Sequence, residues 1–244
     1  MANKNYRTKL LEGLEEKKAK RVIEIIKEKL PKDGKILVLS LTGSRAFGWA
    51  NENYDYDIHG TFAAKNYWDY VHSGEEGSDI NIWELSHIGE DIQHQSFEFL
   101  MNISNPFYIN PKFDFKGLMK FCTIEAVRQK RGDILRQIQE FEIFKNPRAA
   151  LHAYRILMVP IYFLKRKKFE LNIYKINRAY KFKQLEKLKI AYTQREEGWS
   201  EKEVKRDLNR LLKEYDRLCQ EKGEKLDTKK AESWLAKMKK KFYS

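Results

Sequence analysis

Two aspartates separated by a single residue, Asp55 and Asp57, follow a glycine-serine pair at Gly43 and Ser44. If residues 54–63 form a strand, both carboxylates project from the same face, about 6–7 Å apart. Carboxylates this close repel each other and raise each other's pKa unless a cation lies between them. Mg²⁺ suits this place, because it takes hard oxygen ligands and bridges to substrate phosphates. Since the Gly-Ser turn offers N–H groups and a hydroxyl to the same phosphates, the pattern predicts a nucleotidyl-transfer site.

Three short strands and one short helix are expected to position these groups. Residues 36–41 form a continuous apolar run between two glycines, which is typical of a buried strand. A short helix over residues 44–49 would direct its N-terminus at an incoming phosphate. Residues 54–63 and 79–83 alternate polar and apolar side chains, which predicts two further strands.

The third strand supplies a candidate third carboxylate, Asp79. It precedes Ile80 and Ile82, which share the opposite side of the alternation. Because this alternation fixes which side faces the core, Asp79 is expected on the open side, together with the first two aspartates. Glu84 competes for the same role, but it falls on the side of the two isoleucines, so Asp79 is favoured. His59 is expected to share the carboxylate face.

The remaining segments are predicted to be mostly helical. Residues 9–30 carry apolar side chains at helical spacing and stop at Pro31. Residues 66–71 are expected to form a brief helix, and residues 107–115, which include a proline, a linker between two halves. Further helices are predicted over residues 86–104, 117–144, 147–167, 175–193, 200–221 and 228–242.

The 244 residues carry a formal net charge of +13, distributed unevenly along the chain. Residues 1–111 hold 13 Lys and Arg against 17 Asp and Glu, a net charge of −4, so residues 112–244 hold 35 against 18, a net charge of +17. The basic half indicates a polyanionic partner such as RNA or DNA. The alternative is a solvated helical surface rich in Lys and Glu.

Composition also excludes several classes of protein. Two cysteines, Cys122 and Cys219, are too few and too far apart for a cysteine-based metal site or a disulfide framework. No apolar run approaches the ~20 residues of a membrane span, and residues 1–18 lack the apolar core of a signal peptide. We therefore expect a soluble, cytoplasmic protein without a membrane partner.

The motif GSRAFGWANENYDYDIHG, residues 43–60, resembles the DNA polymerase β-like nucleotidyltransferase superfamily. More narrowly, it is similar to predicted nucleotidyltransferases that accompany RNA-repair ligases, whose signature is close to GSRAWGFAS…SDYDVR. The similarity continues through DINIWELSHIGEDIQHQSFEFLMNISNP, residues 79–106, and more loosely through KNPRAALHAYRILM, residues 145–158. Two positions depart from the signature: Tyr54 replaces a serine and His59 replaces an arginine, and neither change removes a ligand.

The resemblance implies an α+β fold, in which a small mixed sheet with flanking helices is followed by a helical domain. We place the catalytic domain at residues 1–110 and the basic helical domain at residues 111–244. The family's pattern implies that the Gly-Ser pair holds the triphosphate and that three aspartates bind two Mg²⁺ ions, with Mn²⁺ as a substitute. The residues matched to these roles are Gly43, Ser44, Asp55, Asp57 and Asp79.

Additional cations are candidates for binding the nucleotide. Arg45 follows the Gly-Ser pair and has two equally supported roles, contact with a phosphate or bracing of the loop. His152 and Arg155 lie three apart on a predicted helix and therefore on one face. With Arg148 nearby, they are expected to grip the triphosphate or the base, unless they form an ordinary exposed helix face.

The expected function is transfer of a nucleotide from an NTP such as ATP to a nucleic-acid end, with RNA as the favoured acceptor and pyrophosphate as the product. Two alternatives stay open. The acceptor could be a hydroxyl on a small molecule or a protein, since this fold hosts many acceptors. The protein could also bind RNA without catalysis.

Overall fold

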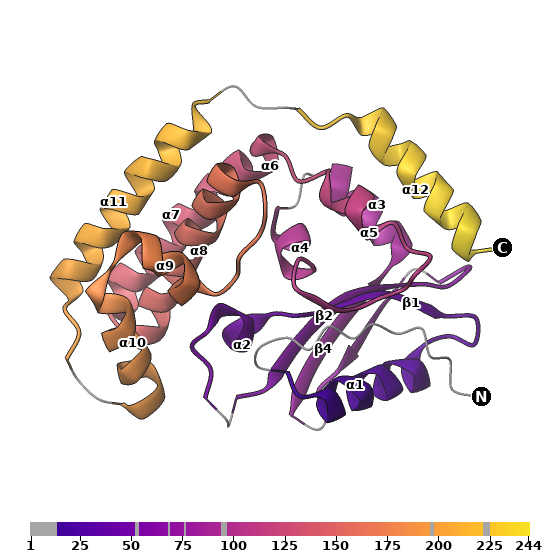
Figure 1. The fold of residues 1–244 in the computed structure, drawn as a ribbon, viewed down its shortest axis with the longest axis horizontal. Coiled ribbons are helices and arrows are strands. Elements are labelled where there is room, and N and C mark those ends of the chain that lie inside the picture. The colour runs from indigo at the N-terminus through magenta and orange to yellow at the C-terminus, as the bar shows by residue number, and fades with distance from the viewer. Residues whose placement is uncertain are drawn as a thin grey trace. The chain divides into compact units, whose positions relative to one another are not determined.

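The computed structural model describes residues 14–51, 54–67, 69–75, 77–93, 97–195, 198–221 and 225–244. A five-stranded mixed sheet with flanking helices (Figure 1) confirms the predicted α+β class. The chain divides into two compact units. The first, which we call the sheet unit, comprises residues 1–46, 53–123 and 225–244, and the second, the helical unit, comprises residues 47–52 and 124–224.

The sheet has the strand order β3-β4-β2-β1-β5. The central strands β2 and β4 run parallel, and the other neighbouring pairs are antiparallel. The strands span β1 (Lys35–Leu41), β2 (Tyr56–Ala63), β3 (Tyr70–Ser73), β4 (Ser78–Glu84) and β5 (Pro106–Ile109). The predicted strands over residues 36–41, 54–63 and 79–83 are the three strands at the centre of this order.

The two faces of the sheet differ in burial. Ile58, Ile80 and Ile82 are fully buried on one face. On the other face Asp79 and Asn81 of β4 alternate with these isoleucines and remain partly exposed. Along β4 one face is packed and the other is accessible, as the period-two pattern predicts, and the accessible face carries the polar groups. In β1, by contrast, residues 36–41 are buried on both faces.

Six helices among the described residues belong wholly or mostly to the sheet unit: α1 (Glu16–Lys29), α2 (Gly43–Phe47), α3 (Leu85–Gln93), α4 (Phe97–Asn102), α5 (Phe115–Met119) and α12 (Thr228–Phe242). The C-terminal helix α12 lies beside α3 (Figure 1). Trp234 of α12 donates a hydrogen bond to Asp114, the N-cap of α5, at 3.2 Å. The sheet unit therefore includes residues 111–123 and α12, which the predicted boundary after residue 110 assigns to the helical domain.

Four local predictions were wrong. Residues 175–193 hold parts of two helices instead of one, α9 (Ile173–Tyr180) and α10 (Lys183–Gln194), because the left-handed backbone of Lys181 ends the first. Residues 66–71 do not form a helix, because Tyr70–Ser73 form the edge strand β3 with alternating exposed and buried side chains. Residues 107–115 are not only a linker, because Pro106–Ile109 form β5, with proline at the first position of an edge strand, where its missing N–H is tolerated. Residues 117–144 hold parts of three helices instead of one.

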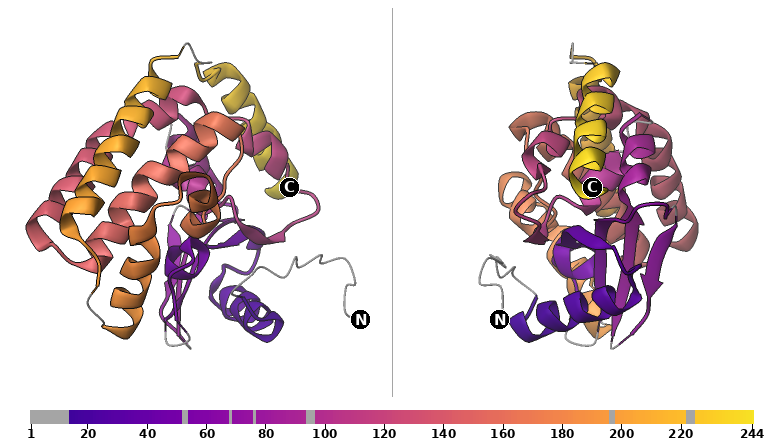
Figure 2. Two further views of the ribbon diagram at one scale, coloured as in Figure 1. Left: turned by 60° about the vertical axis from the view of Figure 1, so that its left-hand side comes forward. Right: turned by 90° about the vertical axis from the view of Figure 1, so that its right-hand side faces the viewer.

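The helical unit is built around α8 (Pro147–Arg166), whose side chains are mostly buried. It is packed by α7 (Arg131–Phe144), α9 (Ile173–Tyr180), α10 (Lys183–Gln194) and α11 (Glu201–Cys219) (Figure 2). Within this core Tyr154 donates a hydrogen bond to Asp207 at 2.7 Å. Neither α8 nor any other helix in the described ranges is long and apolar enough to cross a membrane.

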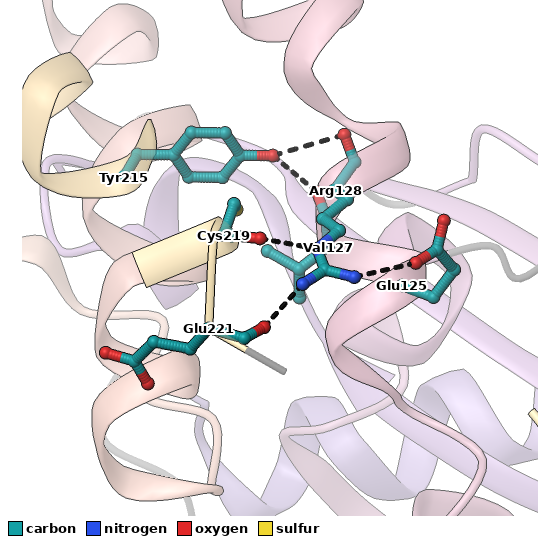
Figure 3. A network of polar contacts seen from close by, with 6 residues as sticks. All are labelled: Glu125, Val127, Arg128, Tyr215, Cys219 and Glu221. Carbon is teal, nitrogen blue, oxygen red and sulfur yellow. Dashed lines mark hydrogen bonds and ion pairs between the residues drawn. The ribbon is translucent and has the colours of Figure 1, made fainter. Parts of the chain in front are cut away.

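A polar network joins the short helix α6 (Ile124–Gln129) to the end of α11 (Figure 3). The guanidinium of Arg128 donates to the carbonyls of Cys219 and Glu221 and to the carboxylate of Glu125. The Tyr215 hydroxyl donates to the carbonyl of Val127. An arginine that satisfies the last carbonyls of a helix also complements its dipole, so this network fixes where α11 ends.

Candidate active site

The three predicted aspartates gather where the parallel strands β2 and β4 begin. Asp57 and Asp79 are direct partners in the parallel register, and such partners point to the same face of a sheet. Asp55 lies one residue before β2 and is exposed. A Cβ built on Gly77 would lie 3.5 Å from the Asp55 carboxylate, which places this third side chain beside the start of β4.

Mutual repulsion marks this group of carboxylates. Burial raises the pKa of Asp57, and the negative charges of Asp79 and Asp55 raise it further. A hydrogen bond from the Ser44 backbone and the charge of Arg45 act in the opposite direction but do not cancel the effect. The described residues therefore compensate the negative charge at this site only in part. This is expected where carboxylates lie near one another and no cation lies between them.

Gly43 is needed because the Asp57 carboxylate lies directly against it. Its backbone has a φ of +63°, and a Cβ at this position would lie 1.7 Å from Oδ2 of Asp57. The turn is also fixed by a backbone hydrogen bond from Thr42 N–H to the carbonyl of Asp57 at 2.8 Å. Any larger side chain would displace the carboxylate, so the Gly-Ser turn and the aspartate form one structural element.

Arg45 braces the segment that leads into β2. Its guanidinium donates to the carbonyl of Tyr54 from Nε at 3.1 Å and from Nη2 at 2.6 Å, and Nε also lies 3.3 Å from the carbonyl of Asp55. The guanidinium stacks 4.0 Å from the ring centroid of Tyr56. Of the two roles predicted for Arg45, these contacts correspond to bracing of the loop.

Asp79 is oriented by two neighbours on the same face. The amide of Asn81 donates to Oδ1 of Asp79 at 2.9 Å, and Nδ1 of His72 lies 3.5 Å from the same oxygen. His72 also contacts the Asn81 amide oxygen at 3.0 Å. The Asp79 side chain remains 50% exposed. The sequence prediction missed His72 because it placed a helix over residues 66–71, directly before it, and the four residues of β3 are too few to show a clear period.

His59 lies on the carboxylate face, as predicted, and faces Asn81 in the register of β2 and β4. Its Nδ1 is buried and has no hydrogen-bond partner among the described residues. Burial lowers its pKa, although the negative charges of Asp79 and Glu98 act against this effect. A neutral imidazole has one nitrogen that donates and one that accepts, and the buried Nδ1 of His59 uses neither role with another described residue.

Glu84, the alternative third carboxylate, lies on the opposite face and is fully buried. Its carboxylate accepts hydrogen bonds from the backbone N–H of Ser86 at 2.7 Å, from that of Ala64 at 3.5 Å, and from the hydroxyl of Tyr243. Burial and the contact with Glu84 raise the pKa of Tyr243. These contacts make Glu84 a structural residue, and Asp79 is the carboxylate that lies with Asp57.

The donor types fit the predicted Mg²⁺, whereas the arrangement of the side chains is incomplete. Carboxylate oxygens are hard ligands, and burial together with the charges of Asp79 and Asp55 raises the pKa of Asp57, an effect that a bound cation would oppose. Nevertheless, among the described residues no three His, Cys, Asp or Glu side chains are arranged to hold a metal ion. Oδ1 of Asp79 accepts the hydrogen bond of the Asn81 amide, so Oδ2 is the oxygen that this side chain would offer to an ion.

The predicted nucleotide-binding cations Arg148, His152 and Arg155 lie on α8 in the helical unit. His152 and Arg155 contact the segment that follows the Gly-Ser turn: the His152 ring lies 5.5 Å from Trp49, and the Arg155 guanidinium 4.8 Å from the ring of Phe47. Burial, together with the charges of the two arginines, lowers the pKa of His152 to about 4. A neutral His152 can donate or accept a hydrogen bond but adds no charge near neutral pH.

A hollow of about 280 Å³ lies beside Arg148 and His152, between α7 and the start of α8. Gln137, Glu140 and Phe144 line its other side. Arg155 does not line this hollow, so the three predicted cations do not form a single surface within the helical unit.

No protein-family model and no curated protein matches the sequence. The argument for function therefore rests on the residues and on their arrangement.

Proposed function

We propose that the protein is a Mg²⁺-dependent nucleotidyltransferase that transfers a nucleotide from an NTP to the end of an RNA. The observation that carries the proposal is the parallel pairing of Asp57 with Asp79, with the Gly43 turn packed directly on the Asp57 carboxylate. The motif predicts that Gly43, Asp57 and Asp79, which are far apart in the chain, belong to one site. Asp57 and Asp79 lie together on the accessible face of the sheet.

The reaction requires an acceptor hydroxyl oxygen to form a bond with the α-phosphorus of the NTP. The bond from this phosphorus to the oxygen that bridges to the β-phosphate breaks, and pyrophosphate leaves with the electron pair. Because such transfers proceed mainly by positioning and by neutralising charge, the protein needs fixed donors and a proton acceptor. It does not need a covalent intermediate.

Each residue of the site has a role in this scheme. Asp55, Asp57 and Asp79 would hold the divalent ions, which would neutralise charge on the triphosphate and make the acceptor hydroxyl more acidic. Asp79 would receive the hydroxyl proton on Oδ2, because its Oδ1 is held by Asn81. The Ser44 hydroxyl would donate to a β- or γ-phosphate oxygen, while Arg45 keeps the segment before β2 in place.

The test is incubation of the protein with Mg²⁺, α-labelled NTPs and total RNA, beside a sample without RNA. Label that enters RNA, and that is absent with Asp57→Asn, supports the proposal. Label found only on the protein or on a small metabolite would replace RNA with another acceptor. Intact RNA affinity with no turnover of any NTP would contradict the catalytic proposal and favour an RNA-binding protein.

A further inference from the structure

One exposed side of α11 carries a row of mostly basic side chains. Five basic residues and one asparagine line an open hollow of about 620 Å³ along this helix. We call this row the α11 stripe, and its members are Lys202, Lys205, Arg206, Asn209, Arg210 and Lys213. The spacing repeats every three or four residues, which places the side chains on one face of the helix.

Most acidic residues of α11 are engaged away from this face, and the exception is Glu201 in the first turn, which pairs with Lys205. Asp207 is buried and accepts the hydrogen bond of Tyr154. Glu203 accepts a hydrogen bond from Gln184, and Glu214 forms an ion pair with Lys165. The apolar side chains of the helix, Val204, Leu208, Leu211 and Tyr215 among them, face the core. The helix therefore separates its charges, with cations outward and acids inward or at the flanks.

Most of the stripe is not neutralised within the protein. Lys202 and Lys213 are exposed and form no ion pair with another described residue. Arg206 lies 3.9 Å from Asp207, at the limit of an ion pair, and the Arg210 guanidinium lies over Phe182. Among the residues that the structure describes, Lys205 is the one member of the stripe with a carboxylate closer than this, Glu201 at 2.8 Å. Such uncompensated charge is retained where an anion binds, because a solvated surface has no need to sort its charges this way.

The shape and chemistry of the stripe fit a polymer of phosphates. From Lys202 to Lys213 the helix rises about 16 Å, the length of several successive phosphates along a nucleic-acid strand. Arginine guanidinium groups bind phosphate through two donors at once. A membrane surface fits less well, because binding there requires large apolar side chains beside the cations, and the large exposed apolar residues in the described ranges all lie outside α11.

We propose that the α11 stripe binds the phosphate backbone of RNA. The choice of RNA rests on the proposed function, but the surface is a separate site in the helical unit, and binding there requires neither an NTP nor a metal ion. Because phosphates carry no base identity, the contact is independent of RNA sequence. It would hold the acceptor strand without selecting it.

The experiment measures binding of a fluorescent single-stranded RNA of mixed sequence by anisotropy, in EDTA and without NTP. The variant carries Lys202→Gln, Arg206→Gln and Lys213→Gln. The matched control carries Lys237→Gln, Lys240→Gln and Lys241→Gln, three exposed lysines of α12 in the sheet unit. Both variants lose the same charge at exposed positions, where substitutions change stability little, and a melting curve of each verifies folding.

The stripe variant is expected to bind RNA about 10- to 100-fold more weakly at about 100 mM salt, and the slope of log affinity against log salt should fall by about 2. The α12 control should change affinity far less. Equal losses for the two variants, or no loss for the stripe variant, would overturn the proposal. So would a stripe variant that loses binding to phosphatidylserine vesicles while RNA affinity is unchanged.

Nucleotide transfer and RNA binding can fail separately in this design. Asp57→Asn, which is expected to lose transfer, should bind RNA as tightly as the wild type. If wild-type protein transfers no nucleotide but the stripe still determines RNA affinity, the proposed function fails and the α11 site stands.

Discussion

The two ends of strand β4 carry carboxylates in opposite circumstances. At the last residue of the strand, Glu84 is fully buried and accepts hydrogen bonds from Ser86, Ala64 and Tyr243. Near the first residue, Asp79 is half exposed and lies beside Asp57, whose pKa is raised by burial and by its acidic neighbours. The same strand therefore holds one satisfied carboxylate and one that repels its neighbour.

This contrast separates stability from function. A buried carboxylate with all its oxygens engaged stabilises the fold, and its removal leaves buried donors without acceptors. Carboxylates that raise one another's pKa cost stability, and a protein retains such groups mainly where a ligand or reaction needs them. Substitutions of Glu84 and of Asp57, the partner of Asp79 on the neighbouring strand β2, should therefore have opposite effects on stability and on activity.

The largest effect is expected for Asp57→Asn. Nucleotide transfer should fall on the order of 10³-fold or more, because charge neutralisation supplies most of the catalysis in phosphoryl transfer. The melting temperature should rise, since the substitution removes one of the repelling charges. Labelled-NTP assays and thermal unfolding measure the two quantities, and Asp69→Asn, at an exposed position in the same unit, is the matched control. If Asp57→Asn lost both activity and stability, the proposed contrast between the aspartates and Glu84 would be wrong.

The reverse pattern is expected for Glu84→Gln. The amide NH₂ of glutamine is a donor, so it would face one of the donors that now bond to the Glu84 carboxylate and leave that donor without an acceptor. Such a loss lowers the free energy of unfolding by about 1–3 kcal/mol. Activity per folded molecule should stay near that of the wild type. Urea unfolding gives the free energy, and Glu90→Gln on the exposed side of α3 is the control. A stable Glu84→Gln protein without activity would move Glu84 into the site.

Mg²⁺ should stabilise the folded protein by binding at the aspartates near the start of β4, and not at Glu84 at its end. A cation at the aspartates binds the folded state and relieves their repulsion, so the melting temperature should rise with Mg²⁺ concentration. When the Mg²⁺ concentration is about 100 times the dissociation constant, the free energy of unfolding should increase by about 2.7 kcal/mol. Glu84→Gln should keep this increase, and Asp57→Asn should lose most of it. An equal response in both variants would place the ion elsewhere.

The local parts of this site follow from the sequence alone. Alternation along β4 places Asp79 opposite to Ile80 and Ile82, and the structure has this arrangement. The exclusion of Glu84 follows from the same alternation. The glycine before Ser44 indicates a tight turn, although only the structure shows that Asp57 packs against it.

The long-range pairing of the strands could not be predicted from the sequence. That β2 and β4 are parallel neighbours, with Asp57 opposite Asp79, depends on the order of the whole sheet. Edge strands β3 and β5 have four residues each, too few for a clear period. The return of α12 to the sheet unit depends on contacts such as Trp234 with Asp114, which are 120 residues apart.

The smallest effect concerns pH and tests the repulsion itself. Because the folded-state pKa of Asp57 is raised, the folded protein binds a proton at higher pH than the unfolded chain does, so acidification through this range favours folding. The gain in melting temperature from Asp57→Asn should therefore be largest near neutral pH and should shrink as the pH falls below the raised pKa and toward the ordinary value of 3.8. Thermal unfolding of both proteins over this range measures the difference. A gain that does not depend on pH would mean that Asp57→Asn acts through packing and not through the raised pKa of this carboxylate.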